Sequence, residues 1–189
     1  MRNIAIFASG SGTNTENIIS HFLSSDKVSV SSVYCNSQTA AVLGKAEKYG
    51  IRTHVFSKAE LSVPGLILST LKEEETDLIV LAGFMLLLPE EITEAYRYRI
   101  LNVHPSLIPK YCGKGMYGGH VHQAVVDAGE KESGITIHFV DDKYDEGDII
   151  LQARCRLSPQ DSAEDVAAKV HALEYRYYPQ VIEQIIDTL

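Results

Sequence analysis

Apolar and polar positions follow two different periods over the first 104 residues. Short apolar runs of strand length are separated by stretches in which apolar residues recur every three or four positions, as on one face of a helix. The strand-like runs cover residues 4–8, 28–34, 53–56, 78–82 and 100–104, and the helical stretches cover residues 17–23, 40–49 and 66–74. This alternation predicts an α/β fold with a mostly parallel sheet.

The pattern changes after about residue 134. Two more strand-like runs, at residues 135–140 and 149–156, are joined by the acidic stretch DDKYDEGD, and a long helical stretch follows. Ser162, with Asp165 three residues later, forms a capping box that starts this last helix, and Pro179 is expected to kink or interrupt it. With 189 residues, 45% of them hydrophobic, and no linker or repeat, the chain is expected to form a single domain over residues 1–189.

The composition narrows the classes of partner. A net charge of -8 repels nucleic acid and anionic membrane surfaces, so neither is expected as a partner, and a bound anion needs a local binding device. The 3 cysteines are far apart and form no C-x-x-C pair, which argues against a disulfide framework and a zinc site. The apolar run at the N-terminus is too short for a signal peptide or a membrane span. A cytoplasmic location is therefore expected.

The segment FASGSGTNTENII follows the first predicted strand. Gly10 and Gly12 allow a tight turn into a helix that opens near Thr13 or Asn14, and Glu16 is placed to complete a cap with Thr13. Backbone N–H groups and the positive end of the helix dipole then converge on one point, where a phosphate monoester can bind. The segment lacks the third glycine of a dinucleotide fingerprint, the Lys of a P-loop and the glycines of a serine-hydrolase elbow. A phosphate site is favoured over a purely structural turn.

The segment LNVHPSLIPKY places an amide and an imidazole at the end of the fifth predicted strand. Residues two apart share a face of a strand, so Asn102 and His104 point to the same side, at the edge where ligands bind in open α/β sheets. An amide donor and a titratable ring can serve one reacting oxygen together. A structural His104 and a metal site are the alternatives. The metal site is disfavoured because His104, His120 and His122 lack the spacing of a zinc-binding motif.

The acidic stretch between the last two strands contains a further candidate, Asp145. Glu146 and Gly147 follow it and allow a sharp turn that could carry the Asp145 carboxylate to the same crevice. A carboxylate near His104 would raise the pKa of the imidazole and fix its orientation. A solvated hairpin turn is the alternative, because Asp and Gly are common turn residues.

Five ordered segments resemble the signature segments of the phosphoribosylglycinamide formyltransferase family: FASGSGTN, IVLAGFMLLLP, LNVHPSLIPKY, GITIHFVDDKYDEGDIILQ and HALEYRYYP. The resemblance spans nearly the whole chain. It implies a Rossmann-like fold, in which a mostly parallel twisted sheet is flanked by helices and followed by a C-terminal strand pair and a long final helix. It also implies a transferase of de novo purine biosynthesis that moves the formyl group of 10-formyltetrahydrofolate, a reduced folate, to the amine of glycinamide ribonucleotide without a metal. A monomer and a homodimer both remain open.

The resemblance also implies a role for residues in each segment. Asn102, His104 and Asp145 would be catalytic, and His138 would support them, although a core position fits His138 about equally well. The implied substrate-binding residues are Gly12, Thr13 and Asn14 for the phosphate and Glu174 for the ribose. The implied folate pocket consists of Phe84, Met85, Leu86, Leu87, Leu88, Asn102, Val140, Asp141, Asp142 and Asp145.

Two departures from the family pattern concern ligand contacts. Many members carry Arg where this chain has Leu86, so one charge anchor for a polyglutamylated folate is missing, and many have a shorter loop in place of KYCGKGMYGGHVHQAV.

Among related functions, formyl-folate hydrolases have a second His where this chain has Pro105, and methionyl-tRNA formyltransferases add an RNA-binding domain and a basic surface. A non-catalytic nucleotide-binding module would not need Asn102, His104 and Asp145 together.

Overall fold

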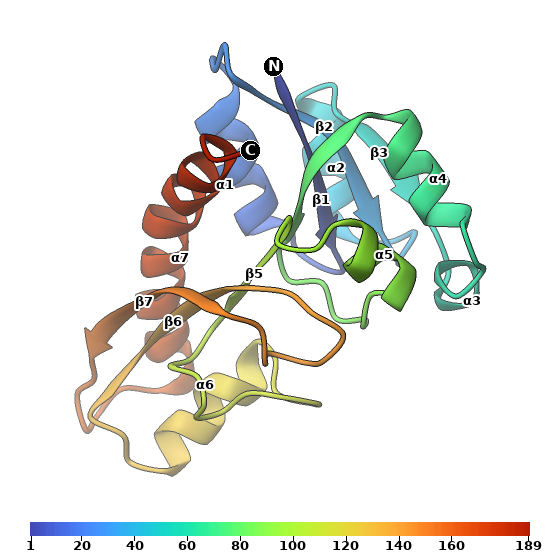
Figure 1. Ribbon diagram of the computed structural model, residues 1–189. Helices are drawn as coiled ribbons and strands as arrows, with labels where there is room; N and C mark the ends of the chain where they lie inside the picture. The colour runs from blue at the N-terminus through green and yellow to red at the C-terminus, as the bar shows by residue number, and fades with distance from the viewer.

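Seven strands form one sheet, and helices cover both of its faces (Figure 1). The computed structural model describes residues 1–189. The strands are β1 (Arg2–Ala8), β2 (Val28–Cys35), β3 (Arg52–Val55), β4 (Thr76–Leu81), β5 (Ile100–His104), β6 (Glu132–Phe139) and β7 (Ile149–Arg156), in the order β3-β2-β1-β4-β5-β6-β7. The helices are α1 (Thr13–Phe22), α2 (Ala41–Lys48), α3 (Lys58–Leu61), α4 (Leu66–Glu73), α5 (Glu90–Ala95), α6 (Gly119–Asp127) and α7 (Ala163–Ile186). The predicted fold class is confirmed.

Successive side chains of the central strands point to opposite faces of the sheet and belong to two apolar clusters, one on each face. In β1, Ile4 and Ile6 belong to the cluster on one face of the sheet, whereas Ala5 and Phe7 belong to the cluster on the other. Helices α1, α2, α6 and α7 contribute to the first cluster, and α3, α4 and α5 contribute to the second. Figure 1 shows α1 and α7 on one side of the sheet and α4 and α5 on the other. Strands covered on both faces need the near-continuous apolar runs that the sequence shows.

The sheet changes direction at β5. Strands β1 to β5 pair in parallel, so their carboxyl ends lie along one edge of the sheet. β6 pairs antiparallel with β5, and β7 pairs antiparallel with β6. The register sets Asn102 opposite His138 and His104 opposite Thr136. The parallel and antiparallel parts therefore meet at the strand that carries the predicted Asn–His pair.

The predicted strands are confirmed to within a few residues. The largest difference is β6, which begins at Glu132 rather than at residue 135. The sequence pattern does not predict α3, α5 or α6. α3 and α5 have 4 and 6 residues, too few for a helical period to show, and α6 follows a glycine-rich segment that reads as a loop.

The predicted cap at the start of α1 is wrong. Gly12 is the N-cap, with a φ of 69°, and no side chain caps the helix. A Cβ at this position would lie 2.5 Å from Cγ2 of Val42, so the turn packs against α2 where only glycine fits. Glu16, which the sequence pairs with Thr13, instead forms an ion pair with Lys45 of α2 at 3.0 Å.

α7 begins at the predicted capping box and continues past Pro179. The Ser162 hydroxyl accepts a hydrogen bond from the Asp165 N–H, and the Asp165 carboxylate accepts one from the Ser162 N–H. Of the two expected effects of Pro179, a kink or an interruption, the interruption is wrong, because α7 is one continuous helix on both sides of it. Proline has no N–H for the carbonyl four residues earlier, which belongs to Tyr175, and Asn17 Nδ2 donates to that oxygen at 3.0 Å. The freed carbonyl therefore ties α7 to α1.

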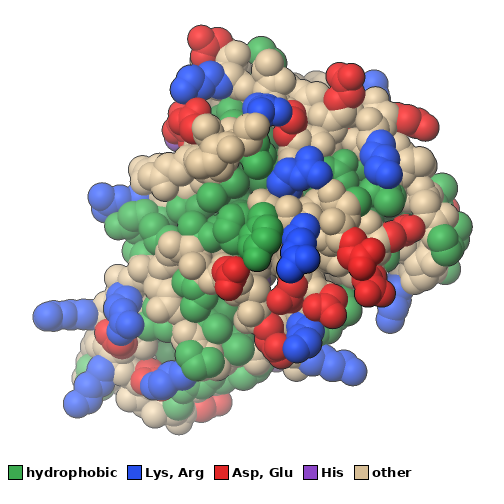
Figure 2. All heavy atoms as spheres, in the orientation of Figure 1, with side chains coloured by type: hydrophobic (Ala, Val, Ile, Leu, Met, Phe, Trp, Pro, Cys, Tyr) green, Lys and Arg blue, Asp and Glu red, His purple; other side chains and the backbone are tan.

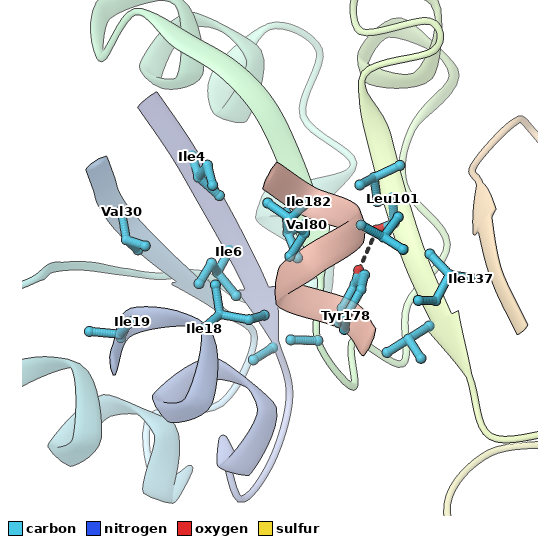
Figure 3. Packing of buried hydrophobic residues seen from close by; sticks show 14 of the residues in the cluster. Ile4, Ile6, Ile18, Ile19, Val30, Val80, Leu101, Ile137, Tyr178 and Ile182 are labelled. Carbon is cyan, nitrogen blue, oxygen red and sulfur yellow. Dashed lines mark hydrogen bonds between the residues drawn. The ribbon is translucent and has the colours of Figure 1, made fainter. Parts of the chain in front are cut away.

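Tyr178 connects α7 to two neighbouring strands, at the carboxyl end of β4 and near the start of β5. Its side chain is fully buried, and its hydroxyl lies 2.9 Å from the Leu81 carbonyl oxygen of β4 and 3.0 Å from the Leu101 carbonyl oxygen of β5. Figure 3 shows the hydroxyl directed at Leu101 within the apolar cluster. This contact fixes α7 relative to the strand that carries Asn102 and His104.

Replacing Tyr178 by Phe should lower the free energy of unfolding by about 1–2 kcal/mol, because the buried carbonyl oxygens lose their hydroxyl partner. Urea denaturation measures this change. The matched control is Tyr175→Phe, since Tyr175 also lies on α7 but is 37% exposed, and its loss should stay below about 0.5 kcal/mol. Equal losses in the two variants would contradict a structural role for the Tyr178 hydroxyl.

Candidate active site

β5 presents Asn102 and His104 to a cavity at the carboxyl edge of the parallel strands. The cavity has a volume of about 500 Å³, and its walls come from segments that are far apart in the sequence. The glycine turn at residues 10–14, the acidic loop through Asp145 and α7 through Glu174 all line it. The structure thus brings the three predicted catalytic residues and the predicted phosphate turn to one place.

His104 is held by a backbone carbonyl on one side and faces Asp145 on the other. Its side chain is buried, and Nε2 lies 2.8 Å from the Tyr111 carbonyl oxygen, so Nε2 carries a hydrogen and donates it. Nδ1 lies 3.5 Å from Oδ2 of Asp145. Burial lowers the pKa of His104 and outweighs the opposing effects of Asp145 and the Tyr111 carbonyl. Asp145 thus raises the pKa of His104 as predicted, but burial, which the sequence does not reveal, is the larger effect.

Asp145 is a buried carboxylate with its own set of donors. Its backbone is in the left-handed region, with a φ of 56°, and its Oδ2 accepts a hydrogen bond from the Gly113 N–H at 2.9 Å. Burial raises the pKa of Asp145, but the His138 ring, whose Nε2 lies 3.7 Å from Oδ1, the charge of His104 and the Gly113 N–H together outweigh it, so the pKa lies below its usual value. The bend that follows needs Gly147, since a Cβ there would lie 1.9 Å from the Phe139 carbonyl oxygen. The acidic stretch is therefore more than a solvated hairpin turn.

His138 orients the amide of Asn102. Its Nδ1 lies 2.7 Å from the Phe139 carbonyl oxygen and carries the hydrogen of that contact, which leaves Nε2 as an acceptor in the neutral ring. Nε2 lies 3.1 Å from Nδ2 of Asn102, so the amide donates one of its two hydrogens to His138. The second hydrogen remains for a ligand. The structure thus places His138 beside Asn102, in the position that a supporting residue would occupy.

Glu174 lines the same cavity as Asp145, but its pKa is shifted in the opposite direction. It is 5% exposed, and its only side-chain partner is Nδ2 of Asn14, at 2.8 Å from Oε2. Burial raises the pKa of Glu174 to about 7, and the hydrogen bond from Asn14 opposes this rise only in part. Two carboxyl groups on one cavity therefore have pKa values shifted in opposite directions.

The residues of the predicted folate pocket are distributed over three adjoining hollows. Phe84 and Met85 line the 500 Å³ cavity with Asn102 and Asp145. Leu86, Leu87, Leu88 and Asp142 line a second hollow of about 600 Å³, which also contains Lys58. Val140, Asp141 and Asp142 line a third, of about 360 Å³. Tyr144 borders the first two hollows, and Leu88 is buried in the apolar cluster beneath the sheet.

Two histidines in the cavity are not singled out as binding residues by the sequence. His122 of α6 is 2% exposed, and His171 of α7 lies beside it, with ring centroids 6.1 Å apart. Burial, with a smaller effect of His171, lowers the pKa of His122 to about 4, and burial lowers the pKa of His171. The sequence shows the H-x-H spacing of His120 and His122. Of these two residues of α6, only His122 lines the cavity, and this depends on how the helix packs. No three His, Cys, Asp or Glu side chains are grouped so that they could hold a metal ion.

Comparison with known proteins places the chain in a family. Residues 2–182 match the family model described as formyl transferase. The phosphoribosylglycinamide formyltransferase of Haemophilus influenzae is 38% identical over 97% of this chain and 86% of its own length, and that of Escherichia coli is 36% identical over 98% and 87%. The crystal structure of phosphoribosylglycinamide formyltransferase from Anaplasma phagocytophilum has a TM-score of 0.89 and 34% identity, and the match covers 99% of this chain and 88% of that one. The chain belongs to the phosphoribosylglycinamide formyltransferase family.

Members of the phosphoribosylglycinamide formyltransferase family are enzymes, and this chain is a formyltransferase. Attack on a formyl carbon places negative charge on its oxygen, and that charge is stabilised by donors that are already in place. Asn102 has a free amide hydrogen here, and a protonated Nδ1 of His104 would supply a second donor. The carboxylate of Asp145 lies where it favours that protonated form.

Replacing Asp145 by Asn should lower the pKa of His104 further in this formyltransferase, because the variant removes the negative charge that opposes burial. An NMR titration of the His104 ring resonances measures the pKa. Glu146→Gln is the matched control, since Glu146 is the next residue and forms an ion pair with Lys143 at 3.2 Å. The idea would be refuted if the His104 pKa were the same in Asp145→Asn and in the unchanged protein.

Replacing Glu174 by Gln should stabilise the unliganded protein far more at pH 8.5 than at pH 5. The pKa of Glu174 rises from 4.5 to about 7 on folding, so the folded state binds more protons between these values and loses stability as the pH rises through them. The gain at pH 8.5 should reach at most about 3 kcal/mol, measured by urea denaturation at both pH values. Glu164→Gln, in the exposed first turn of α7, should show no such difference between the two pH values. A gain of equal size at both pH values would contradict the raised pKa.

Proposed function

We propose that this chain transfers the formyl group of 10-formyltetrahydrofolate to the amine of 5-phosphoribosylglycinamide. The products are N-formylglycinamide ribonucleotide and tetrahydrofolate, in a step of de novo purine biosynthesis. The observation that carries the proposal is the convergence of Asn102, His104 and Asp145 on the cavity that also contains the Gly12 turn and Glu174. An oxyanion site, a phosphate turn and a ribose acceptor meet there.

The proposed chemistry proceeds through a tetrahedral intermediate. The substrate amine forms a bond to the formyl carbon, and the carbonyl electron pair moves onto oxygen. The free amide hydrogen of Asn102 and the Nδ1–H of protonated His104 stabilise this oxygen. The bond between the formyl carbon and the folate nitrogen then breaks, and the proton lost by the amine passes to that nitrogen with the help of Asp145.

Burial makes Asp145 essential to this scheme. The pKa of His104 lies below its usual value, so a neutral ring is the resting form of the unliganded site near neutral pH. The negative charge of Asp145, 3.5 Å from Nδ1, lowers the cost of forming the imidazolium when charge develops on the substrate. His138 acts as a positioning residue, because its contact with Asn102 fixes which end of the amide faces the substrate.

The substrates divide between the two sides of the cavity in this proposal. The phosphate binds to the N–H groups of Gly12, Thr13 and Asn14 at the start of α1, and the ribose hydroxyls bind to Glu174. The pterin lies along Phe84, Met85, Leu86, Leu87 and Leu88, with Val140, Asp141 and Asp142 of the acidic loop beside it.

The remaining features of the proposal concern the whole chain. Residues 1–189 act as one formyltransferase domain in the cytoplasm, as a monomer or a homodimer, with no metal and no nucleic-acid partner. On the face in Figure 2, Lys and Arg side chains are interspersed with Asp and Glu, so that face offers no continuous basic surface. None of the helices has the length and apolar content needed to cross a membrane.

The test measures the release of tetrahydrofolate by its absorbance, with and without glycinamide ribonucleotide. Release that depends on the ribonucleotide supports the proposal. Release without it would indicate a formyl-folate hydrolase instead. Nucleotide binding with no release in either case would indicate a non-catalytic module.

The variants Asn102→Ala and His104→Ala should each lower kcat by roughly 100-fold to 1000-fold, because each removes one donor to the developing oxyanion. The affinity for glycinamide ribonucleotide, measured by calorimetry, should change little. His21→Ala is a control on α1, since His21 lies on the surface beside Glu183, and it should leave kcat unchanged. Loss of both turnover and nucleotide binding in His104→Ala would point to a structural role for His104.

A further inference from the structure

The cavity that contains the catalytic candidates has one cationic side chain that the proposed mechanism does not use. Lys114 is the only Lys or Arg among its lining residues, which also include the carboxyl groups of Asp145 and Glu174. The net charge of the chain is -8. A phosphate dianion that enters this cavity therefore meets an acidic molecule with a single fixed positive charge at the site.

The charge of Lys114 is not committed to another group of the protein. Its side chain is exposed, and it takes part in none of the ion pairs or side-chain hydrogen bonds in the structure. Lys110 and Lys143, by contrast, are each paired with a glutamate, at 2.7 Å and 3.2 Å respectively. Lys131 is also unpaired, but it does not line the cavity. An unpaired lysine at the rim of a cavity can bind an anionic ligand without first breaking an ion pair.

The backbone on both sides of Lys114 holds the residue at the cavity. Gly113 and Gly115 have φ values of +91° and +89°, which side chains rarely adopt, and a Cβ at either position would contact nothing within 4 Å. The Gly113 N–H donates to Oδ2 of Asp145 at 2.9 Å. The segment is therefore attached to the Asp145 carboxylate one residue before Lys114, and the Met116 N–H closes it by donating to the Gly113 carbonyl oxygen at 3.0 Å.

A second, independent observation indicates a polar ligand group in the same cavity. Nδ1 of His122 is buried and has no hydrogen-bond partner, although the His122 side chain is 2% exposed and lines the cavity. An unpaired buried polar atom is unfavourable, so its partner is expected to come from a bound molecule. α6, which carries His122, begins at the end of the glycine-rich segment that carries Lys114.

We infer that Lys114 binds the phosphate of the substrate and makes the enzyme selective for the phosphorylated ribonucleotide over its riboside. This inference rests on the proposed function. In it, the N–H groups of the Gly12 turn supply directed hydrogen bonds, and the Lys114 ammonium supplies the full positive charge that an acidic chain otherwise lacks. Selectivity follows because the Lys114 ammonium is attracted much more strongly to a phosphate dianion than to a neutral hydroxyl.

The experiment compares Lys114→Gln with the unchanged enzyme on two substrates, glycinamide ribonucleotide and the dephosphorylated riboside. For the ribonucleotide, kcat/KM should fall by roughly 10-fold to 100-fold, the usual effect of losing a hydrogen bond to a charged group. For the riboside, the two proteins should be equal, and KM for 10-formyltetrahydrofolate should not change. Lys114→Arg should recover most of the loss. Lys131→Gln is the control for net charge, since Lys131 is exposed and does not line the cavity.

Two results would overturn the inference. One is a kcat/KM for the ribonucleotide within about twofold of the unchanged enzyme, and the other is an equal loss on the riboside. Calorimetric binding of ribose 5-phosphate keeps this test separate from the proposed function. If the unchanged protein transfers no formyl group, weaker binding of ribose 5-phosphate by Lys114→Gln than by Lys131→Gln still supports the phosphate contact, and equal binding refutes it.

Discussion

The antiparallel pairing of β6 with β5 determines the geometry of the whole site. It sets His138 directly across from Asn102, which allows the ring to orient the amide at 3.1 Å. β6 ends opposite Leu101, near the start of β5, and the acidic loop that follows runs back toward the carboxyl end, where Asp145 lies 3.5 Å from His104. A parallel pairing would need a long crossover connection between β5 and β6. The change of strand direction thus pairs the amide with the ring that orients it, and the acidic loop adds the carboxylate.

Local surroundings, rather than burial alone, decide which carboxyl group is charged. Asp145 and Glu174 are both buried on the same cavity, yet the pKa of Asp145 is lowered and that of Glu174 is raised to about 7. Asp145 receives the Gly113 N–H and faces two histidines, whereas Glu174 has a single amide partner. The first is therefore suited to stabilise a cation beside it, and the second can change its protonation state near neutral pH.

The sequence predicts those features that depend on local pattern. Strand periods, the Asn102–His104 spacing and the Ser162 cap are all local, and the structure contains each of them. The start of α1 is not predicted correctly, because its geometry depends on contact between Gly12 and Val42 of another helix. The direction of the His104 pKa shift needs the depth of burial, and the place of His122 needs α6, a helix that follows glycines and shows no clear period. These are properties of packing between distant segments, which a single sequence does not contain.

Pro179 shows why general rules for strengthening helices need care in this fold. A proline within a helix is commonly replaced by alanine to restore the missing backbone bond. Here the restored N–H would compete with Asn17 for the Tyr175 carbonyl, and that contact joins α7 to α1 only one turn from the bond between Asn14 and Glu174. Replacing Pro179 would thus make the helix more regular, but it would weaken the contact between α7 and α1 at the wall of the ligand cavity. Engineering of this scaffold for thermal tolerance is best planned with Asn17 and Pro179 as one inseparable pair.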